Sequence, residues 1–228
     1  MVRLQGPGFQ QMTTLLRIDT SITGRSSASR ELTDHYVAAW KRQLPATRVV
    51  TRDLGLMPVP HLDPERLAAL STPREERSAD QHRIFSDSER WVSEIEAADA
   101  IVIGMPMYNF QAPSAFKAWF DHVARAGRTF RYTESGPEGL LSDRPVQVIS
   151  TRGGIHEDSG RDWQTPWLRQ ALGLLGLEDL RLVTAEGLNL SDVERRRSMN
   201  RARVLVESAA MIAAECTGLG RRVAGEAV

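Results

Sequence analysis

The stretch DAIVIGMPMYNF, residues 99–110, passes from an uninterrupted aliphatic segment into a proline, two aromatic residues and an asparagine. Its aliphatic part is typical of a central strand in a parallel sheet, because helices bury such a strand on both faces. Similar strand-like segments recur along the chain, with helical patterns between them, at residues 13–21, 47–54, 144–151 and 180–187. This alternation predicts an α/β fold with an open, doubly wound parallel sheet of five strands and helices on both faces.

Helices are predicted where apolar residues recur every three or four positions and where capping residues precede them. Thr72, followed by Pro73 and Glu75, shows one such start. The predicted helices cover residues 32–44, a segment from an N-cap at Thr72 to Ile95, a segment from Ser114 to Val123, a segment after an N-cap at Thr165, and a segment from Ser191 to about Gly218.

Composition narrows the class of protein and of partner. The 228 residues carry 29 basic and 29 acidic side chains, so the net charge gives no reason to expect nucleic acid or an anionic membrane as a partner. No apolar stretch approaches the roughly 20 residues of a membrane span. The only cysteine, Cys216, excludes a disulfide framework and a CxxC metal site, and we expect it to be a buried apolar residue of a cytoplasmic protein.

The chain shows no low-complexity linker, internal repeat or abrupt change of charge that would divide it. Residues 1–12 are predicted to be a loose N-terminal extension, with Met12 as an alternative start. Residues 13–228 are predicted to form a single domain.

Three loops leave the carboxyl ends of the predicted strands, and they are the most unusual loops of the chain. They read TSITGRSSAS (residues 20–29), PMYNFQAP (residues 106–113) and TRGGIHEDSG (residues 151–160). Because the carboxyl ends of parallel strands meet at one edge of the sheet, we expect the loops to lie together. Ligands of doubly wound folds bind at this edge, so it is the place to look for a functional site.

The first loop places several hydroxyls at the start of a helix, namely Ser21, Thr23, Ser26, Ser27 and Ser29. Free amides and the positive end of the helix dipole favour an anion such as phosphate at this position. The loop lacks the lysine of a nucleoside-triphosphate loop, the GxGxxG fingerprint and the cysteine of a thiol-dependent phosphatase. Taken alone, the loop is equally well explained as a serine-rich helix cap without a ligand.

The second and third loops suggest a flat ligand. Pro106 and Pro113 stiffen the second loop, in which Met107, Tyr108 and Phe110 supply apolar area and Asn109 supplies donors and an acceptor. The alternative is that these aromatic residues only cap the core. In the third loop Gly153 and Gly154 would let a ligand approach the backbone, beside Thr151, Arg152 and His156, although His156 is more simply a solvated loop residue. A mononucleotide with a flat ring matches all three loops, and FMN is the natural candidate.

The chain resembles a known family in a long block. PMYNFQAPSAFKAWFDHVARAGRTFRYTESGPEGLL (residues 106–141), together with STRGGIH (residues 150–156), closely resembles the FMN-dependent azoreductases, which act as NAD(P)H:quinone oxidoreductases. The similarity runs in order from about Thr14 to Gly187. It implies a flavodoxin-like three-layer sandwich with sheet order 2-1-3-4-5, bound FMN, NADH or NADPH as electron donor, and quinones or aromatic azo compounds as acceptors.

The resemblance also implies site residues and an assembly. FMN would be bound by two groups of residues. The phosphate would be held by Ser21, Ser27, Ala28 and Ser29. The ring would be held by Pro106, Met107, Tyr108, Asn109, Phe110, Thr151, Arg152, Gly153 and Gly154. Asn109, Tyr132 and His156 are expected near the ring or substrate. The family forms homodimers whose active sites lie at the subunit interface. Ala28 and Leu174 depart from the family, since relatives often carry a glutamine in place of Ala28, and some place an aromatic residue that covers the substrate in place of Leu174.

No residue is predicted to carry out covalent or strong acid–base catalysis, and no metal site is predicted, because the chain shows no matching spacing. The reaction would take place on FMN, by two-electron hydride transfer with ping-pong kinetics. Two alternatives remain, a flavodoxin-like carrier of single electrons and a protein that keeps the fold without catalysis.

Overall fold

The central sheet has five strands in the order β2-β1-β3-β6-β7, and every neighbouring pair is parallel. The computed structural model describes residues 12–157 and 159–226. The strands are β1 (Thr14–Asp19), β2 (Arg48–Asp53), β3 (Ala100–Pro106), β6 (Val146–Thr151) and β7 (Leu180–Ala185). The predicted order 2-1-3-4-5 is confirmed, with β6 and β7 as the fourth and fifth strands of the sheet.

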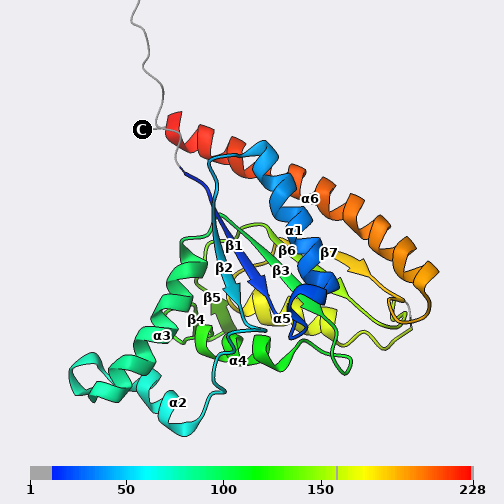
Figure 1. Ribbon diagram of the computed structural model, residues 1–228. Coiled ribbons are helices and arrows are strands. Elements are labelled where there is room, and N and C mark those ends of the chain that lie inside the picture. Colours follow the sequence, from blue (N-terminus) through cyan, green and yellow to red (C-terminus); the bar gives the residue numbers. More distant parts are fainter. Residues whose placement is uncertain (1–11, 158, 227–228) are drawn as a thin grey trace, which may run out of the picture.

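Helices cover both faces of this sheet and give a three-layer sandwich (Figure 1). One face carries α1 (Ala28–Gln43) and α6 (Asp192–Glu226). The other face carries α3 (Ala79–Glu96), α4 (Ser114–Val123) and α5 (Gln164–Leu174). The predicted α/β class with helices on both faces is therefore confirmed.

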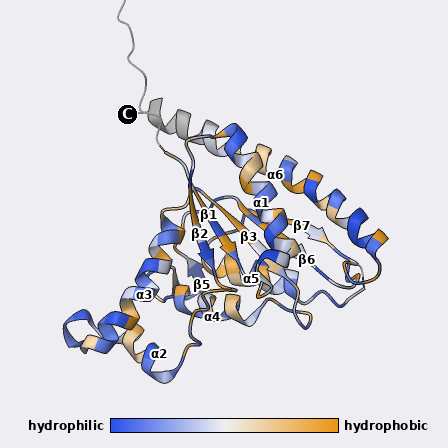
Figure 2. Ribbon diagram, in the orientation of Figure 1, coloured by the Kyte–Doolittle hydropathy of each residue, from blue (hydrophilic) through white to orange (hydrophobic). Residues whose placement is uncertain are grey.

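The two cores follow from the alternation of side chains along the strands. Leu15 of β1 packs with Trp40 of α1, whereas the next residue, Leu16, belongs to the cluster that contains Trp91 of α3. All residues of β3 are buried, which explains its continuous aliphatic sequence. Figure 2 shows the apolar strands inside the molecule and the mixed character of the helices around them.

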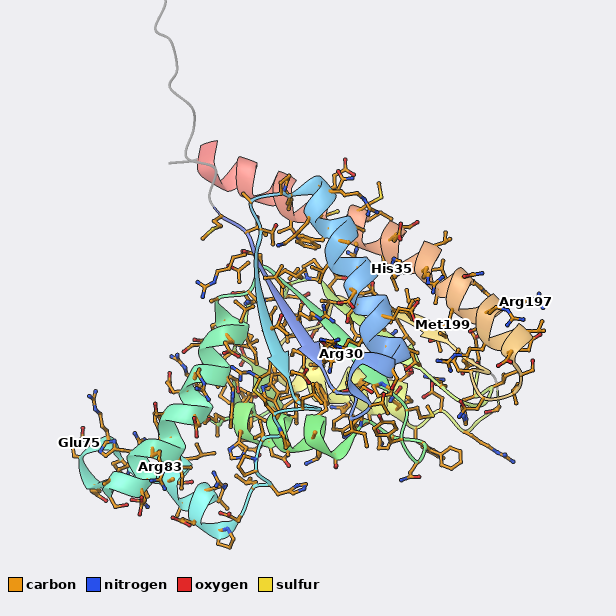
Figure 3. All side chains as sticks on the ribbon, in the orientation of Figure 1. Arg30, His35, Glu75, Arg83, Arg197 and Met199 are labelled. Atoms are coloured by element: carbon orange, nitrogen blue, oxygen red, sulfur yellow. The ribbon has the colours of Figure 1, made fainter. Side chains whose placement is uncertain are left out.

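The helix α6 lies along α1. His35 Nδ1 of α1 is 3.0 Å from Glu207 Oε1 of α6. Figure 3 shows Arg197 of α6 pointing away from the body of the molecule, whereas Met199, which is buried, lies on the side that faces it. The helix therefore packs through one face and leaves the other to solvent.

One predicted helix start is wrong. Thr72 ends the short helix α2 (Pro64–Ser71), where its amide donates to Ala68 O at 2.8 Å. A single turn, η2 (Arg74–Glu76), follows, and α3 begins at Ala79. The reason is a reciprocal capping box, in which Gln81 N donates to Ser78 Oγ at 3.2 Å and Ser78 N donates to Gln81 Oε1 at 2.9 Å.

Two further helix ends differ from the prediction. Asp162, not Thr165, caps α5, because Asp162 Oδ1 accepts from Gln164 N at 3.1 Å and from Thr165 N at 3.0 Å. The helix α6 starts as predicted, with Glu194 N donating to Ser191 Oγ at 3.2 Å. It does not end near Gly218 but continues to Glu226, and Gly218 does not adopt the positive φ of a C-terminal glycine cap.

An antiparallel hairpin of β4 (Phe130–Thr133) and β5 (Gly136–Gly139) was not predicted. After the hairpin the chain soon enters the amino end of β6, and Leu141 N donates to Leu175 O, just beyond α5, at 3.0 Å. The hairpin therefore lies at the amino ends of the strands, opposite the edge where the predicted loops leave the sheet.

Three expectations concern parts of the chain outside the sheet. Residues 1–11 of the predicted N-terminal extension lie outside the described residues. Cys216 is exposed on α6, so the prediction that it is buried was wrong. Among the residues that the structure describes, no helix is both long and apolar enough to cross a membrane.

Candidate functional site

The order of the strands reverses between β1 and β3, because β2 lies on one side of β1 and β3 on the other. In open α/β sheets, ligands bind beyond the carboxyl ends of the strands at such a point. The predicted loops after β1, β3 and β6 all leave the sheet at this edge.

The loop after β1 forms the turn η1 (Gly24–Ser26) and then starts α1. Ser27 is the N-cap, since Arg30 N donates to Ser27 Oγ at 3.2 Å and Glu31 N donates to Ser27 O at 3.0 Å. The amides of Ala28 and Ser29 have no acceptor within the helix, as is usual for a first turn. Ser27 and Ser29 are buried, and their hydroxyl oxygens are 3.1 Å apart. The helix start thus presents amides and hydroxyls at one place.

A partly buried ion-pair cluster lies beneath this helix start. Arg30, labelled in Figure 3, places Nη1 at 2.7 Å from Asp53 Oδ2 and 3.1 Å from Asp19 Oδ2. Burial by itself would raise the pKa of Asp53, but the hydrogen bond from Arg30 and the amides of Leu56 and Gly55 outweigh it and lower the pKa of this carboxyl. The positive charge of Arg30 is therefore neutralised within the protein, and the loop offers an anion mainly neutral donors.

Gly55, just after β2, supports the same loop from the side. A Cβ at this position would lie 1.9 Å from the backbone oxygen of Ser21, a distance that no real Cβ contact reaches. Only glycine allows this approach between the two backbones. Sequence reasoning missed Gly55, because glycine after a strand is the commonest of turn signals.

The segment after β3 makes a tight turn at Asn109 and Phe110. Both residues have positive φ, 49° and 67°, and Tyr108 and Gln111 exchange two backbone hydrogen bonds of 2.9 and 3.0 Å around them. Positive φ at both central positions is the signature of a type I′ turn, which normally takes asparagine or glycine. Phenylalanine is unusual there and costs about 1–2 kcal/mol. The structure therefore holds the two predicted ring-contacting side chains in a strained, exposed position.

Direct contacts tie the three strand-end loops together. Tyr108 Oη lies 3.3 Å from Ser21 Oγ, which joins the loops after β3 and β1. Met107 N donates to Thr151 O at 2.8 Å, which joins the segment after β3 to the carboxyl end of β6, and the rings of Phe110 and His156 meet edge-on. The structure thus brings the predicted phosphate and ring residues to one rim.

His156 also lies at this rim. Its ring meets that of Phe110 edge-on, with 5.6 Å between centroids. A Cβ on Gly154 would come 3.1 Å from His156 Nε2, so glycine leaves room for the imidazole beside the backbone. His156 Nδ1 is buried without a hydrogen-bond partner among the described residues. The imidazole therefore forms part of the wall of the site. It is not the freely solvated loop side chain that the simpler interpretation of the sequence suggests.

Arg152 occupies a different position from its predicted neighbours. Its guanidinium is buried, with Nη1 at 3.0 Å from Glu186 Oε1 and Nη2 at 2.8 Å from Asp162 Oδ2. Burial would raise the pKa of Asp162, but hydrogen bonds from Thr165 and Arg152 outweigh it, and the net pKa is lowered. The side chain of Arg152 faces the protein interior, so it supports the loop after β6 rather than lining its surface.

Two residues missed by sequence reasoning complete the wall. Glu186 Oε1, just after β7, accepts from His156 N at 3.0 Å and from Glu157 N at 3.1 Å. Gln164, the first residue of α5, is fully buried. Its side chain hydrogen-bonds to Pro106 O at the end of β3 and to Ser150 Oγ of β6. A glutamic acid after a strand and a glutamine at the start of a helix carry no local signal of such a role.

Tyr132 and Leu174 lie elsewhere. Tyr132 is 76% exposed on the hairpin of β4 and β5, and Leu174 is the last residue of α5, next to that hairpin. Both are at the amino ends of the strands, away from the loops of their own chain.

Within residues 12–157 and 159–226, no three histidine, cysteine, aspartate or glutamate side chains gather in a way that could hold a metal ion.

Comparisons with known proteins agree with this geometry. A family described as having a flavodoxin-like fold matches residues 13–207. An FMN-dependent NADH:quinone oxidoreductase of Cellvibrio japonicus is 47% identical over 184 residues, which cover 81% of this chain and 92% of that protein. An FMN-dependent NADH:quinone oxidoreductase 3 of Pseudomonas aeruginosa is 45% identical and covers 84% and 90%.

A solved structure is similar along the same length. The FMN complex of an FMN-dependent NADH-azoreductase from Bacillus anthracis has a TM-score of 0.79 and 27% identity, with 87% of this chain and 98% of that chain covered. The family match extends over all three strand-end loops. This chain belongs to the flavodoxin-like family and, within it, to the FMN-dependent NADH:quinone oxidoreductases.

Proposed function

We propose that this protein is an FMN-dependent NADH:quinone oxidoreductase that also reduces aromatic azo compounds. The observation that carries the proposal is the single rim formed by the loops after β1, β3 and β6, with a hydroxyl-rich helix start at one end and a strained Asn109–Phe110 turn at the other. The names of its relatives, at 41–47% identity, point to the same activity.

The residues of the rim fit FMN. The amides of Ala28 and Ser29 and the buried hydroxyls of Ser27 and Ser29 would hold the phosphate, with the dipole of α1 behind them. The ring would lie between the Asn109–Phe110 turn and the backbone of Gly153 and Gly154. Ala28 removes the longer side chain of many relatives and leaves the phosphate to backbone and hydroxyl donors.

The two sides of the ring would have different tasks. Asn109 is exposed in the turn and offers an amide to the polar edge of the ring, where negative charge develops on reduction. Phe110, which is 48% exposed, and His156 form an edge against which a flat acceptor would pack. Bound FMN supplies the two-electron chemistry, so the protein needs no nucleophile or acid–base pair of its own.

Donor and acceptor would use the same face in turn, which predicts ping-pong kinetics. A quinone and an azo compound both present a flat, electron-poor group to that face. Either NADH or NADPH would be the donor, and the names of the relatives favour NADH.

We further propose a homodimer with active sites at the subunit interface. Tyr132 and Leu174, which the family resemblance puts over the substrate, cannot reach the loops of their own chain from the amino ends of the strands. A second copy would bring them there, and the 76% exposure of Tyr132 leaves its ring free for this contact.

The test is spectroscopic. The purified protein with FMN is treated anaerobically with NADH and then with a benzoquinone, in parallel with NADPH and an azo dye. We expect the flavin absorption to bleach with NADH and to return with either acceptor. A flavin that binds but is not bleached by either nicotinamide would favour a single-electron carrier instead, and a protein that binds no flavin would overturn the proposal.

The dimer has its own test. Asn109→Ala and Tyr132→Ala variants are mixed, dissociated and reassociated, and turnover is compared with that of each variant alone. If one chain supplies Tyr132 to the other's site, mixed dimers regain one intact site and part of the activity. A monomer in sedimentation would contradict the arrangement.

A further inference from the structure

Three buried polar side chains form a chain of hydrogen bonds beneath the candidate site. Arg152 Nε donates to Ser150 Oγ at 3.0 Å, and Ser150 Oγ donates to Gln164 Oε1 at 2.7 Å. Ser150 and Gln164 are 0% exposed and Arg152 is 2% exposed. Asp162 and Glu186 fix the far end of this chain by their ion pairs with Arg152. The carboxamide oxygen of Gln164 is thereby held in one orientation.

That orientation directs the amide nitrogen of Gln164 toward the turn after β3. Gln164 Nε2 donates to Pro106 O at 3.1 Å and to Gln111 O at 3.3 Å. Pro106 precedes the turn and Gln111 follows it, so one side chain holds both ends of the segment. Gln111 is held further by a hydrogen bond from its Nε2 to Trp163 O at 3.3 Å.

The turn needs such support. Asn109 and Phe110 both have positive φ, and residues persist in strained backbone regions only where the surrounding structure fixes them. The buried Gln164 amide donates to the carbonyl groups of Pro106 and Gln111, and the Gln111 carbonyl accepts from Tyr108 N as well. Losing the amide therefore removes this donor from the Pro106 carbonyl, and a buried acceptor is costly to leave without one. An apolar side chain of similar shape at position 164 would supply no donor.

We propose that Gln164 is a positioning residue that holds the Asn109–Phe110 turn in its binding conformation and couples it, through Ser150 and Arg152, to the loop after β6. This inference rests on the proposed function, in which the turn and that loop border the two sides of the flavin ring. Without the amide the turn relaxes in the free protein. Binding FMN must then order it again, which weakens affinity.

The first test needs no flavin. Amide hydrogen exchange of residues 107–112 is compared in the flavin-free wild type, in Gln164→Met, which keeps the length of the side chain and removes its donors, and in Gln170→Met. Gln170 is exposed on the same helix and makes a matched control. We expect exchange at the Gln111 amide to become about tenfold faster in Gln164→Met and to be unchanged in Gln170→Met. Wild-type exchange in Gln164→Met would overturn the proposal.

The second test asks whether the turn meets the ring. FMN dissociation constants and the visible circular dichroism of bound FMN are measured for the same proteins. We expect about tenfold weaker binding and an altered flavin spectrum in Gln164→Met only. A lower thermal stability with wild-type affinity and spectrum would show a merely structural role and would also overturn the proposal.

A milder variant covers the case in which Gln164→Met does not fold. Ser150→Ala removes the donor that orients the Gln164 amide and leaves Gln164 itself in place. We expect about threefold weaker FMN binding and faster exchange at Gln111, and wild-type values for both would overturn the proposal. If the wild type itself binds no FMN, the proposed function fails, while the exchange measurement still decides whether Gln164 fixes the turn.

Discussion

The two ends of the candidate site are built in different ways. At the β1 end, donors come from the regular start of α1, which Ser27 caps, and Gly55 packs closely against the backbone of Ser21 in the same loop. At the β3 end, the donors and aromatic edges sit on a turn with positive φ at Asn109 and Phe110. The first end uses local helix geometry, whereas the second depends on buried side chains from β6 and α5.

This difference suggests a division of labour. A phosphate needs only several donors at one place, which a helix start supplies in any protein. A flavin ring needs side chains held in fixed positions beside its edge, and such positions must be supported by surrounding packing.

The largest effect is expected at Gly55. Gly55→Ala would force a Cβ into the backbone of Ser21 and should lower the free energy of unfolding by about 3 kcal/mol and abolish FMN binding. The matched control is Gly173→Ala on α5, where a Cβ would meet nothing within 4 Å and should add up to about 1 kcal/mol of stability. Thermal and urea unfolding measure both, and equal effects in the two variants would contradict the role of Gly55.

At the β3 end, Asn109 allows backbone and side chain to be separated. Asn109→Gly keeps a residue that tolerates the φ of 49° and removes only the amide, whereas Asn109→Ala adds strain. We expect both to lower turnover with bound FMN about tenfold to a hundredfold, and only Asn109→Ala to lower stability, by about 1 kcal/mol. Steady-state kinetics at saturating FMN and thermal unfolding measure the two effects. Wild-type turnover in Asn109→Gly would contradict a role of the Asn109 side-chain amide in the reaction.

The helix start should respond to the phosphate alone. Ser29→Ala removes a buried hydroxyl and should weaken FMN binding about fivefold, but leave the weaker binding of riboflavin unchanged, because riboflavin lacks the phosphate. Ser26→Ala, in an exposed position of the same loop, is the control. Fluorescence titration with both flavins measures this, and an equal loss for FMN and riboflavin would place Ser29 away from the phosphate.

The smallest effect is a pH dependence shared by both ends. Burial alone would raise the pKa values of Asp53 and Asp162. Both pKa values are nevertheless lowered in the folded protein, because Arg30 and Arg152, together with backbone amides, favour the ionised form of these carboxyl groups. Their contribution to stability is therefore present above the unfolded pKa of about 3.9 and is lost as pH falls through the lower folded values. Asp53→Asn and Asp162→Asn should each show a smaller loss of stability between about pH 5 and pH 3 than the wild type, as measured by unfolding at each pH. An unchanged slope in both variants would contradict these assignments.

The sequence was a good guide wherever the structure depends on local pattern. The aliphatic run of β3, the alternation of strands and helices and the hydroxyls at the start of α1 all predict features that the structure contains. These signals work because burial and helix capping act on neighbouring residues. The misplaced start of α3 shows the limit, since Thr72 and Ser78 both precede plausible helices and only the structure tells which one caps α3.

The support of the site could not be predicted in this way. The resemblance places Arg152 at the edge of the ring, and nothing in the sequence indicates that its guanidinium is buried between Asp162 and Glu186. Gln164 and Gly55 act through contacts with residues far away in the chain, and neither has a local signature. The strain at Phe110 is also invisible in the sequence, because nothing in the letters NF indicates positive φ at both positions.

The most direct test of the central claim is a crystal structure of the protein with FMN. We predict that the phosphate binds at the amides of Ala28 and Ser29, and that the ring lies between the Asn109–Phe110 turn and Gly153–Gly154, with the turn unchanged. FMN bound at another edge of the sheet, or a turn that opens when the ring binds, would contradict the account.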